Sequence, residues 1–280
     1  MAWAVLLTAV AAGVMPVSSL GSPVAAADRV EVIARHIPVV PVTSGRSERA
    51  GGWLRPATKV RRIVLVGDSL AKEMAPFLQF LTYPRDLTER VWGGTAPCDW
   101  TSSPLGADRA TLVIVSFTGN SLTQCMTAPD GSLLQGEQVV EQYRYDVGQI
   151  IDSARRTGAR VLLVGQPLPM AVLGVDAVVD GINQMYRTYA AKYPFVAYVD
   201  AGAAVESPDG AYTDRLPCTQ FDPDCGPDGT TIVRGDGVHF CPALERDPCL
   251  VWSSGAFRFG MAVAVAANSY RRYEIGRAHV

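Results

Sequence analysis

The chain has 280 residues, of which 48% are hydrophobic, so it is long enough to bury one large core and has the composition of a globular protein. Its 25 basic and 27 acidic side chains give a formal net charge of −2. The two signs are mixed along the chain and no basic stripe alternates with aromatic residues, which argues against nucleic acid as a partner.

The first 27 residues have the pattern of a secretory signal. No charged side chain precedes Asp28, residues 2–15 are apolar, and small residues fill 22–27 (SPVAAA). We therefore expect cleavage after Ala27 and a secreted or extracytoplasmic protein. The start lacks Lys and Arg, which is typical of a truncated reading frame. The alternative is an uncleaved membrane anchor, against which the glycine and prolines that interrupt the apolar run argue.

Six cysteines agree with export, because disulfides persist outside the cytosol. Their number is even and none forms a CxxC pair, whereas a zinc site normally groups its thiolates more tightly. We therefore expect three disulfides rather than a metal site. Six cysteines allow fifteen connectivities. Proximity in the sequence favours Cys98–Cys125, Cys218–Cys225 and Cys241–Cys249.

The sequence divides into a central domain and two ends. Residues 28–58 mix Pro, Ser, Gly and Arg without sustained periodicity, so we interpret them as an N-terminal arm or linker that holds His36 in solvent. Residues 59–273 form the predicted domain. We expect residues 274–280 to be non-native, since the IGRAHV end matches one reading frame of a common sequencing adapter, and we give His279 no function.

Within the predicted domain, short apolar runs alternate with amphipathic segments. Apolar runs rich in β-branched residues indicate strands that are covered on both faces, and apolar steps of three and four indicate helices. The predicted strands are Ile63–Val66, Thr111–Phe117, Arg160–Val164 and Phe195–Val199, with a weaker one at Thr88–Trp92. The predicted helices are 139–154 with Gly158 as its C-cap, 178–193 and 254–273. This alternation predicts a parallel sheet in a three-layer α/β/α sandwich, with ligands beyond the carboxyl ends of the strands.

The stretch GDSLAKEMAPF, residues 67–77, follows the first predicted strand. Asp68 or Ser69 suits the N-cap of a helix, but Ser69 at the end of a strand is also placed as a nucleophile, which needs a base. His239 is the one histidine inside the predicted domain. Asp236, three residues earlier, can accept from its Nδ1 and leave Nε2 for Ser69. An isolated DxxH is more often a surface loop.

Two other strand ends offer donors to an oxyanion. Gly94, in WGGT, has a backbone amide with no Cβ in the way, and Asn120, in FTGN, has a side-chain amide. With the amide of Ser69 they would form a three-donor oxyanion hole. Taken singly, a glycine or an asparagine after a strand is ordinarily turn chemistry. Their placement after separate strands of one sheet favours a shared site.

These motifs together resemble the SGNH (GDSL-type) hydrolase superfamily over about residues 59–273. Gly67-Asp68-Ser69-Leu70 resembles the first block, Gly94 the second-block glycine, and Asp236 with His239 the Asp-x-x-His block. The third block, Gly-x-Asn-Asp, is similar to Gly119-Asn120, but the spacer is missing and Ser121 replaces the Asp.

The resemblance implies a flavodoxin-like fold and ester hydrolysis with neither metal nor cofactor. It assigns Ser69 as nucleophile, His239 as base, Asp236 as its orienting acid, and Gly94, Asn120 and the Ser69 amide as oxyanion donors. The GGTAPCDW and DGVHFCP contexts resemble secreted actinobacterial members, and also SGNH domains attached to membrane acyltransferases that modify envelope glycans.

We therefore expect a secreted serine esterase for O-acyl esters, acetyl or other short acyl groups on carbohydrate or envelope material. An O-acyltransferase is the first alternative, and a non-catalytic glycan-binding module of the same fold is the second. The expected partners are a small-molecule, lipid or glycan ester and the cell envelope, and we expect a monomer.

Two further features have ordinary explanations. Residues 221–229 have the acidic character of a calcium loop but lack its ligand spacing, so we interpret them as a solvated turn. Trp92 and Trp100 would line an acyl or sugar site, or equally pack at the core or its rim.

Overall fold

Six strands form the central sheet of this computed structural model, which describes residues 42–44, 60–102, 109–222, 224–242 and 253–269. The strand order is β1-β6-β5-β4-β2-β3. The strands are β1 Val42–Ser44, β2 Arg62–Gly67, β3 Asp86–Val91, β4 Leu112–Ser116, β5 Arg160–Val164 and β6 Val196–Val199. All neighbours from β3 to β6 pair in parallel, in the flavodoxin-like order. The parallel α/β architecture predicted from the sequence, including the weaker strand, is confirmed.

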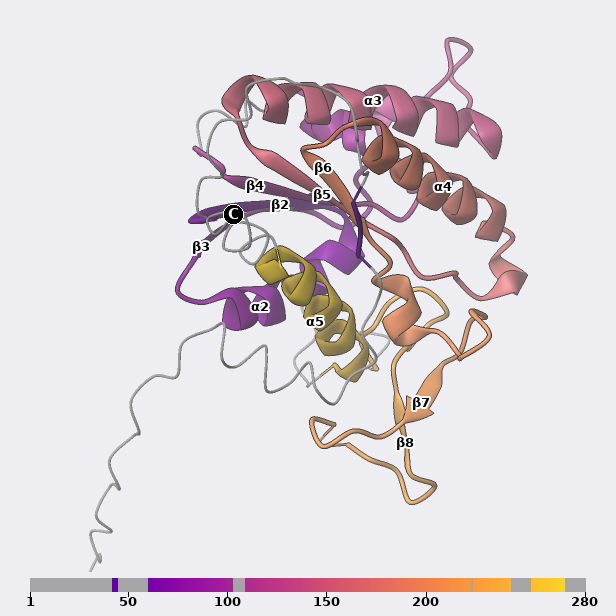
Figure 1. The fold of residues 1–280 in the computed structure, drawn as a ribbon. Helices are drawn as coiled ribbons and strands as arrows, with labels where there is room; N and C mark the ends of the chain where they lie inside the picture. The colour runs from indigo at the N-terminus through magenta and orange to yellow at the C-terminus, as the bar shows by residue number, and fades with distance from the viewer. Residues whose placement is uncertain (1–41, 45–59, 103–108, 223, 243–252, 270–280) are drawn as a thin grey trace, which may run out of the picture.

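Four helices cover the two faces of this sheet (Figure 1). They are α2 Ser69–Thr82, α3 Glu137–Thr157, α4 Asp176–Lys192 and α5 Ser254–Ser269. Helices α3 and α4 pack together on one face, and α2 and α5 on the other. Gly158 ends α3 in the left-handed conformation, with φ of 76°, as its sequence position predicted. The predicted end of the last helix, after 269, lies outside the described residues.

Successive residues of a strand point to opposite faces of the sheet and belong to two separate hydrophobic layers. Ile63 and Leu65 of β2 pack with α2 and α5, whereas Val64 and Val66 pack with α3 and α4. Because both faces of the sheet are covered, each strand needs apolar residues at successive positions. This explains why the strands appear in the sequence as continuous apolar runs.

One part of the predicted N-terminal arm belongs to the sheet. β1 lies inside residues 28–58 and pairs antiparallel with β6, Val42 opposite Val199. This strand within the predicted arm or linker was not anticipated from the sequence. Three residues are too few for a periodic signal, but they satisfy backbone groups along the edge of β6.

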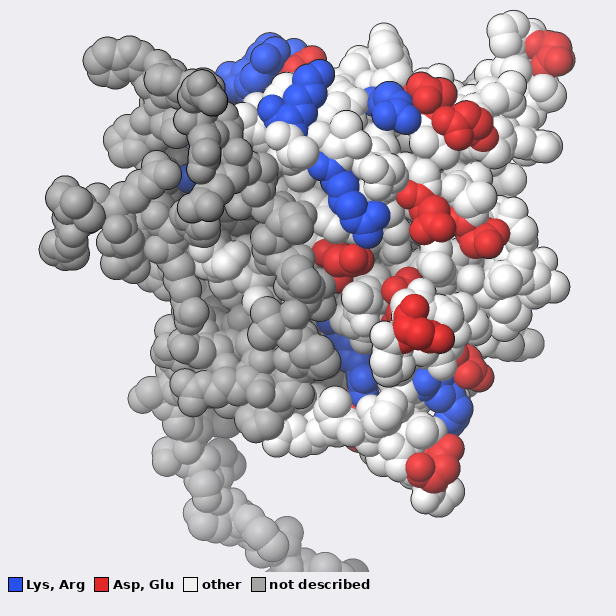
Figure 2. Space-filling view, turned by 45° about the vertical axis from the view of Figure 1, so that its right-hand side comes forward, with Lys and Arg blue, Asp and Glu red and all other residues white. Residues whose placement is uncertain are grey.

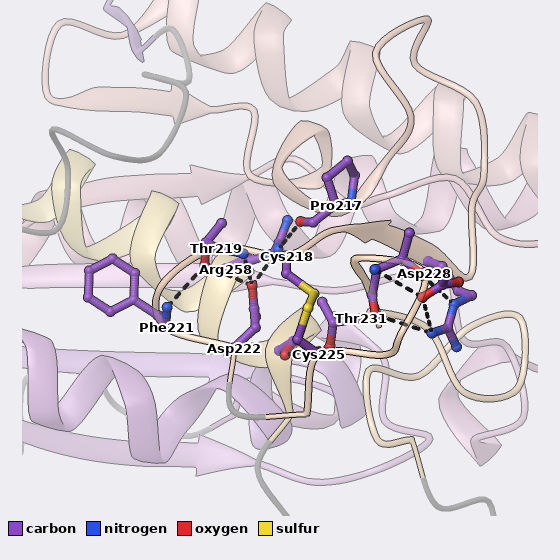
Figure 3. Close-up of a disulfide and its surroundings, with 12 residues drawn as sticks. Pro217, Cys218, Thr219, Phe221, Asp222, Cys225, Asp228, Thr231 and Arg258 are labelled. Carbon is purple, nitrogen blue, oxygen red and sulfur yellow. Dashed lines mark hydrogen bonds and ion pairs between the residues drawn. A yellow bond between two sulfur atoms is a disulfide. The ribbon is translucent and has the colours of Figure 1, made fainter.

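A small hairpin of β7 Arg215–Pro217 and β8 Thr230–Ile232 lies below the main sheet. The Cys218–Cys225 disulfide closes its loop (Figure 3). Inside that loop Asp222 is buried and lies 2.6 Å from the Arg258 guanidinium of α5. The interpretation of this segment as a solvated turn is therefore wrong at Asp222, whose carboxylate holds the hairpin to α5.

The disulfides agree with the pairing that sequence proximity favoured. Cys98 is bonded to Cys125, which joins the short helices η1 (Pro97–Trp100) and η3 (Gln124–Met126). Cys241 is also disulfide-bonded. Its expected partner, Cys249, lies outside the described residues. The predicted Cys98–Cys125 and Cys218–Cys225 bridges are thus confirmed.

Figure 2 shows both signs of charge interspersed on one face of the molecule, among uncharged residues. Within the described part of the chain, no helix combines the length and the apolar character that crossing a bilayer requires. The predicted signal, residues 1–27, and the predicted non-native tail, 274–280, lie outside that part.

Candidate active site

Ser69 stands at the first turn of α2, directly beyond the carboxyl end of β2. The strand runs into the helix at Gly67, where an added Cβ would lie 2.3 Å from the Ser116 carbonyl oxygen and 2.4 Å from Ala71 Cβ. A glycine is therefore required for this close approach. Asp68 caps the helix, since its side chain accepts from the Leu70 amide at 3.2 Å. The cap is Asp68, which leaves the Ser69 hydroxyl for other partners.

Three side chains from two distant segments form a continuous hydrogen-bonded line. His239 Nε2 lies 2.9 Å from Ser69 Oγ, and His239 Nδ1 lies 2.7 Å from Asp236 Oδ2. The second Asp236 oxygen accepts from the Val238 and His239 amides at 2.9 and 2.6 Å. The structure thus brings together the three residues that the sequence assigned as nucleophile, base and orienting acid.

The hydrogen bonds to Asp236 also fix its charge. Burial by itself would raise the pKa of this carboxyl. The bonds from the His239 amide, the His239 ring and the Val238 amide outweigh that effect and hold the pKa below its usual range. An ionised Asp236 keeps the proton on Nδ1 of His239, so Nε2 faces Ser69 as an acceptor.

The turn that contains the predicted donor Gly94 lies against Ser69 through the preceding residue, Gly93. A Cβ added at Gly93 would lie 3.8 Å from Ser69 Cβ. A Cβ added at Gly94 would have no heavy atom of the described residues within 4 Å, apart from its chain neighbours. The turn closes with the Thr95 amide 3.3 Å from the Trp92 carbonyl oxygen, and Gly94 adopts a φ of 78°. Within the described residues neither glycine amide donates a backbone hydrogen bond. Gly93 therefore joins Gly94 as a candidate oxyanion donor.

Asn120 is held beside the nucleophile by Asp68. Its Nδ2 donates to Asp68 Oδ2 at 3.0 Å and lies 3.4 Å from Thr118 Oγ1. The Tyr143 hydroxyl donates to the Asn120 carbonyl oxygen at 2.9 Å. One amide proton is therefore used by Asp68, and the second has only a long contact. Its role as an oxyanion donor remains a prediction.

Asp68 also binds the loop after β4, which the sequence did not indicate. Besides Leu70 and Asn120, it accepts from the Thr118 amide and the Thr118 hydroxyl, both at 2.6 Å. The side chain is fully buried, and this burial raises the pKa of the carboxyl in spite of those bonds. Asp68 thus ties the loop after β4 to the residue next to the nucleophile. The one sequence signal was its place beside Ser69.

Two more charged residues next to the site were missed. Glu73, one turn after Ser69, accepts from the Phe240 amide at 2.7 Å. Arg234, buried beneath the histidine loop, donates to the Gly237 and Leu168 carbonyl oxygens at 3.3 and 3.4 Å. Burial lowers the pKa of Arg234 to about 10. Both residues stand close to predicted site residues, but their contacts with Phe240 and Leu168 span long stretches of the sequence, so spacing could not reveal these contacts.

Apolar side chains lie next to the Gly93 turn and next to the histidine loop. Trp92, whose surface is 67% exposed, precedes the Gly93 turn and has the Lys72 ammonium 5.3 Å from its ring centroid. On the histidine side, Met170 and Leu173 contact the Cβ position of Gly237 at 3.1 and 3.6 Å. Trp100, by contrast, packs against the core and donates to Thr95 Oγ1. Of the two tryptophans, Trp92 is therefore the exposed one.

Among the described residues, one group has the spacing of metal ligands, namely Cys98, Asp99 and Cys125. Its two sulfur atoms are bonded to each other, so they are not free to hold an ion. The group therefore offers no thiolate pair to a metal.

A family described as “Protein of unknown function (DUF459)” matches residues 96–246. No curated protein matches the chain. Similar solved structures include the C-terminal catalytic domain of peptidoglycan O-acetyltransferase A from Streptococcus pneumoniae, at 16% identity and a TM-score of 0.48, covering 76% of this chain and 96% of that one. Another is LAE5, an alpha/beta hydrolase enzyme from a metagenome of Lake Arreo, at 14% identity and a TM-score of 0.49, covering 76% and 97%.

A third similar structure is a GDSL-like lipase from Bacteroides thetaiotaomicron, at 13% identity and a TM-score of 0.45, covering 79% of this chain and 93% of that one. Its GDSL-like description names the same type of hydrolase that the sequence motifs resemble. Each of these structures is under 25% identical to the chain, so none of them assigns its substrate.

Proposed function

The chain belongs to the family described as “Protein of unknown function (DUF459)”, and since that description assigns no activity, we propose from the site itself that it is a serine esterase for O-acyl esters. The observation that carries the proposal is the line from Ser69 Oγ through His239 to Asp236, with contacts of 2.9 and 2.7 Å. A serine hydroxyl with a base at this distance, itself oriented by a carboxylate, is the arrangement of an activated nucleophile.

The reaction would proceed through an acyl-enzyme. Ser69 Oγ bonds to the ester carbonyl carbon while His239 Nε2 takes the hydroxyl proton, and the carbonyl electron pair moves to oxygen. The amides of Ser69 and of the Gly93–Gly94 turn, with Asn120 beside them, would stabilise that oxyanion. Collapse expels the alcohol, which receives the proton from His239. Water then repeats the sequence and releases the acid.

For the substrate we propose short acyl groups on carbohydrate or other envelope material. Trp92 supports this choice, because its exposed indole adjoins the turn that touches Ser69 and offers an apolar face to a sugar ring. The loop from Gly165 to Val175 contains no charged residue and borders Gly237, which suits the uncharged acyl part of an ester. The disulfides support an extracytoplasmic site of action, where we propose that the chain acts as a monomer without metal or cofactor.

Two measurements test the proposal. A fluorophosphonate probe should label the wild type at Ser69, as located by mass spectrometry, and should not label Ser69→Ala. p-Nitrophenyl esters of graded chain length, together with acetylated polysaccharides, should then give the substrate preference. An unlabelled, inactive wild type would contradict the esterase and favour the non-catalytic module.

The same acyl-enzyme would acylate a sugar if a hydroxyl group replaced water. Product analysis with a glycan acceptor present separates the two outcomes. Free acid supports the esterase, and acylated acceptor supports the acyltransferase alternative.

A further inference from the structure

Glu73 links the helix that carries the nucleophile to the loop that carries the base. It lies four residues after Ser69 on α2, so the two side chains share one face of the helix. Its Oε2 accepts from the Phe240 amide at 2.7 Å, and the Cys241 amide is a second donor to the same carboxylate. These are the two residues that follow His239. One carboxylate therefore anchors the chain immediately beyond the catalytic base.

This contact does what Asp236 cannot do. Asp236 belongs to the same short loop as His239, so its hydrogen bonds orient the imidazole within the loop. They do not fix the loop relative to Ser69, which lies 170 residues away in the sequence. The Ser69–His239 hydrogen bond joins two side chains, whereas Glu73 accepts from the backbone of the loop. It sets the position of the whole loop rather than of one ring.

The charge of Glu73 has a second consequence. Four ionisable groups of the described chain surround His239. Asp236 and Arg234 belong to its own loop, Asp68 is the N-cap of α2, and Glu73 lies within α2. Burial raises the pKa of Glu73, while the charge on His239 and the amide bonds oppose that rise. When Ser69 transfers its proton, His239 becomes an imidazolium next to this anion, and a nearby opposite charge stabilises it.

We propose that Glu73 is a positioning residue of this site, which holds the His239 loop against the Ser69 helix and supplies a second anion to the imidazolium. The inference rests on the proposed function, since it concerns the base of that reaction. It predicts that loss of the carboxylate impairs proton transfer without removing any group that touches the substrate.

The test compares Glu73→Gln, which keeps an acceptor oxygen but loses the charge, with Glu73→Ala, which loses both. We expect Glu73→Ala to lower kcat/KM for p-nitrophenyl acetate by about 10²-fold, because small misplacements of catalytic groups cost that much. Glu73→Gln should lose about tenfold and move the acid limb of the kcat/KM profile by about one pH unit to lower pH, because an anion that favours the imidazolium is gone. KM should change little in either variant.

Glu141→Gln is the matched control. It removes the same charge from an exposed position on α3, where Glu141 pairs with Arg144 at 3.3 Å. Exposed pairs of this kind contribute little, so its rate and its pH profile should match the wild type. If Glu73→Gln matches this control in both rate and profile, the proposal is overturned. It is also overturned if Glu73→Ala loses activity only in proportion to the unfolded fraction, with an unchanged profile.

A second readout is independent of turnover. The imidazole NMR titration of His239 should have a lower midpoint in Glu73→Gln than in the wild type, with both proteins carrying Ser69→Ala. A lower midpoint supports the inference even if no ester is hydrolysed, and equal midpoints overturn it. Absence of fluorophosphonate labelling in the wild type, with the midpoint shift present, would contradict the proposed function alone.

Discussion

Asp68→Asn gives the sharpest test of how the nucleophile and the oxyanion donors are held together. Asp68 has four donors, namely the Leu70 amide, the Thr118 amide, the Thr118 hydroxyl and Asn120 Nδ2. An asparagine with its oxygen in place of Oδ2 keeps the last three as weaker, neutral bonds. The asparagine nitrogen then faces the Leu70 amide. Because both groups are hydrogen-bond donors, the Leu70 amide has no acceptor and the helix loses its N-cap. The geometry of the Asn120 side chain is loosened by the same change.

The effect of this change on stability should be moderate. A buried donor left without a partner costs about 1–3 kcal/mol. Against this, burial outweighs the hydrogen bonds and raises the pKa of Asp68, so the neutral side chain avoids a desolvation cost. We expect a net loss of about 1–2 kcal/mol, which is about 2–8 °C in Tm for a domain of this size. Thermal unfolding followed by circular dichroism would measure it.

The effect on catalysis should be larger. If Asp68 aims Asn120 at the oxyanion, Asp68→Asn should lower kcat by on the order of 10²-fold, close to the loss in Asn120→Ala. The double variant should then be little worse than either single one, because the two residues act as a unit. p-Nitrophenyl acetate hydrolysis well below Tm is the assay. Losses that multiply in the double variant would refute the idea that Asp68 acts through Asn120.

The remaining predictions concern the nucleophile, the disulfides and pH. Ser69→Ala and His239→Ala should each lower kcat by several orders of magnitude, with the double variant little worse; more than about a tenth of wild-type activity in Ser69→Ala would exclude it as nucleophile. Replacing Cys98 and Cys125 by serine should cost about 3 kcal/mol from the chain entropy of the opened loop and lower kcat at temperatures where the protein stays folded. The matched Cys218→Ser/Cys225→Ser control should lower Tm with kcat preserved, and equal kcat losses in both would contradict the role of the first bridge. Folding raises the pKa of Asp68. The stability that this shift contributes is fully present below about pH 3.9 and is lost as the pH rises through the folded pKa. The unfolding free energy of the wild type, measured relative to Asp68→Asn, should therefore be larger at pH 3 than at pH 7.

The sheet was predictable because its physics is local. Strands such as β5 are covered on both faces, so Arg160–Val164 is visible as an apolar run whatever the rest of the chain does. The same holds for α3, whose buried face recurs at three- and four-residue steps. β1 and the β7–β8 hairpin are strands of three residues, which is too short for any period to appear.

The triad was predictable for a different reason. The predicted domain contains one histidine, and its acid lies three residues away, so two of the three members form a local motif. The contacts that hold them in place have no such local signal, although Asp68 itself lies in the first block. Asp68 meets Thr118 across 50 residues and Glu73 meets Phe240 across 167, and each contact exists only because the fold brings distant segments of the chain together. The approach of Gly93 to Ser69 is of the same kind, since turn geometry decides which of two adjacent glycines lies against Ser69.

The first turn of α2 emerges as the centre from which the whole site is arranged. Asp68 holds the loop after β4, Ser69 carries the hydroxyl, and Glu73 holds the loop that contains His239. Behind them, Leu70 and Met74 are fully buried in the layer shared with α5, so the helix has no room to turn. A shift of Ser69 relative to His239 or to the loop after β4 would therefore require Asp68 or Glu73 to give up its hydrogen bonds. In this arrangement the packing of α2 fixes the position of Ser69, and two carboxylates fix the neighbouring loops relative to it.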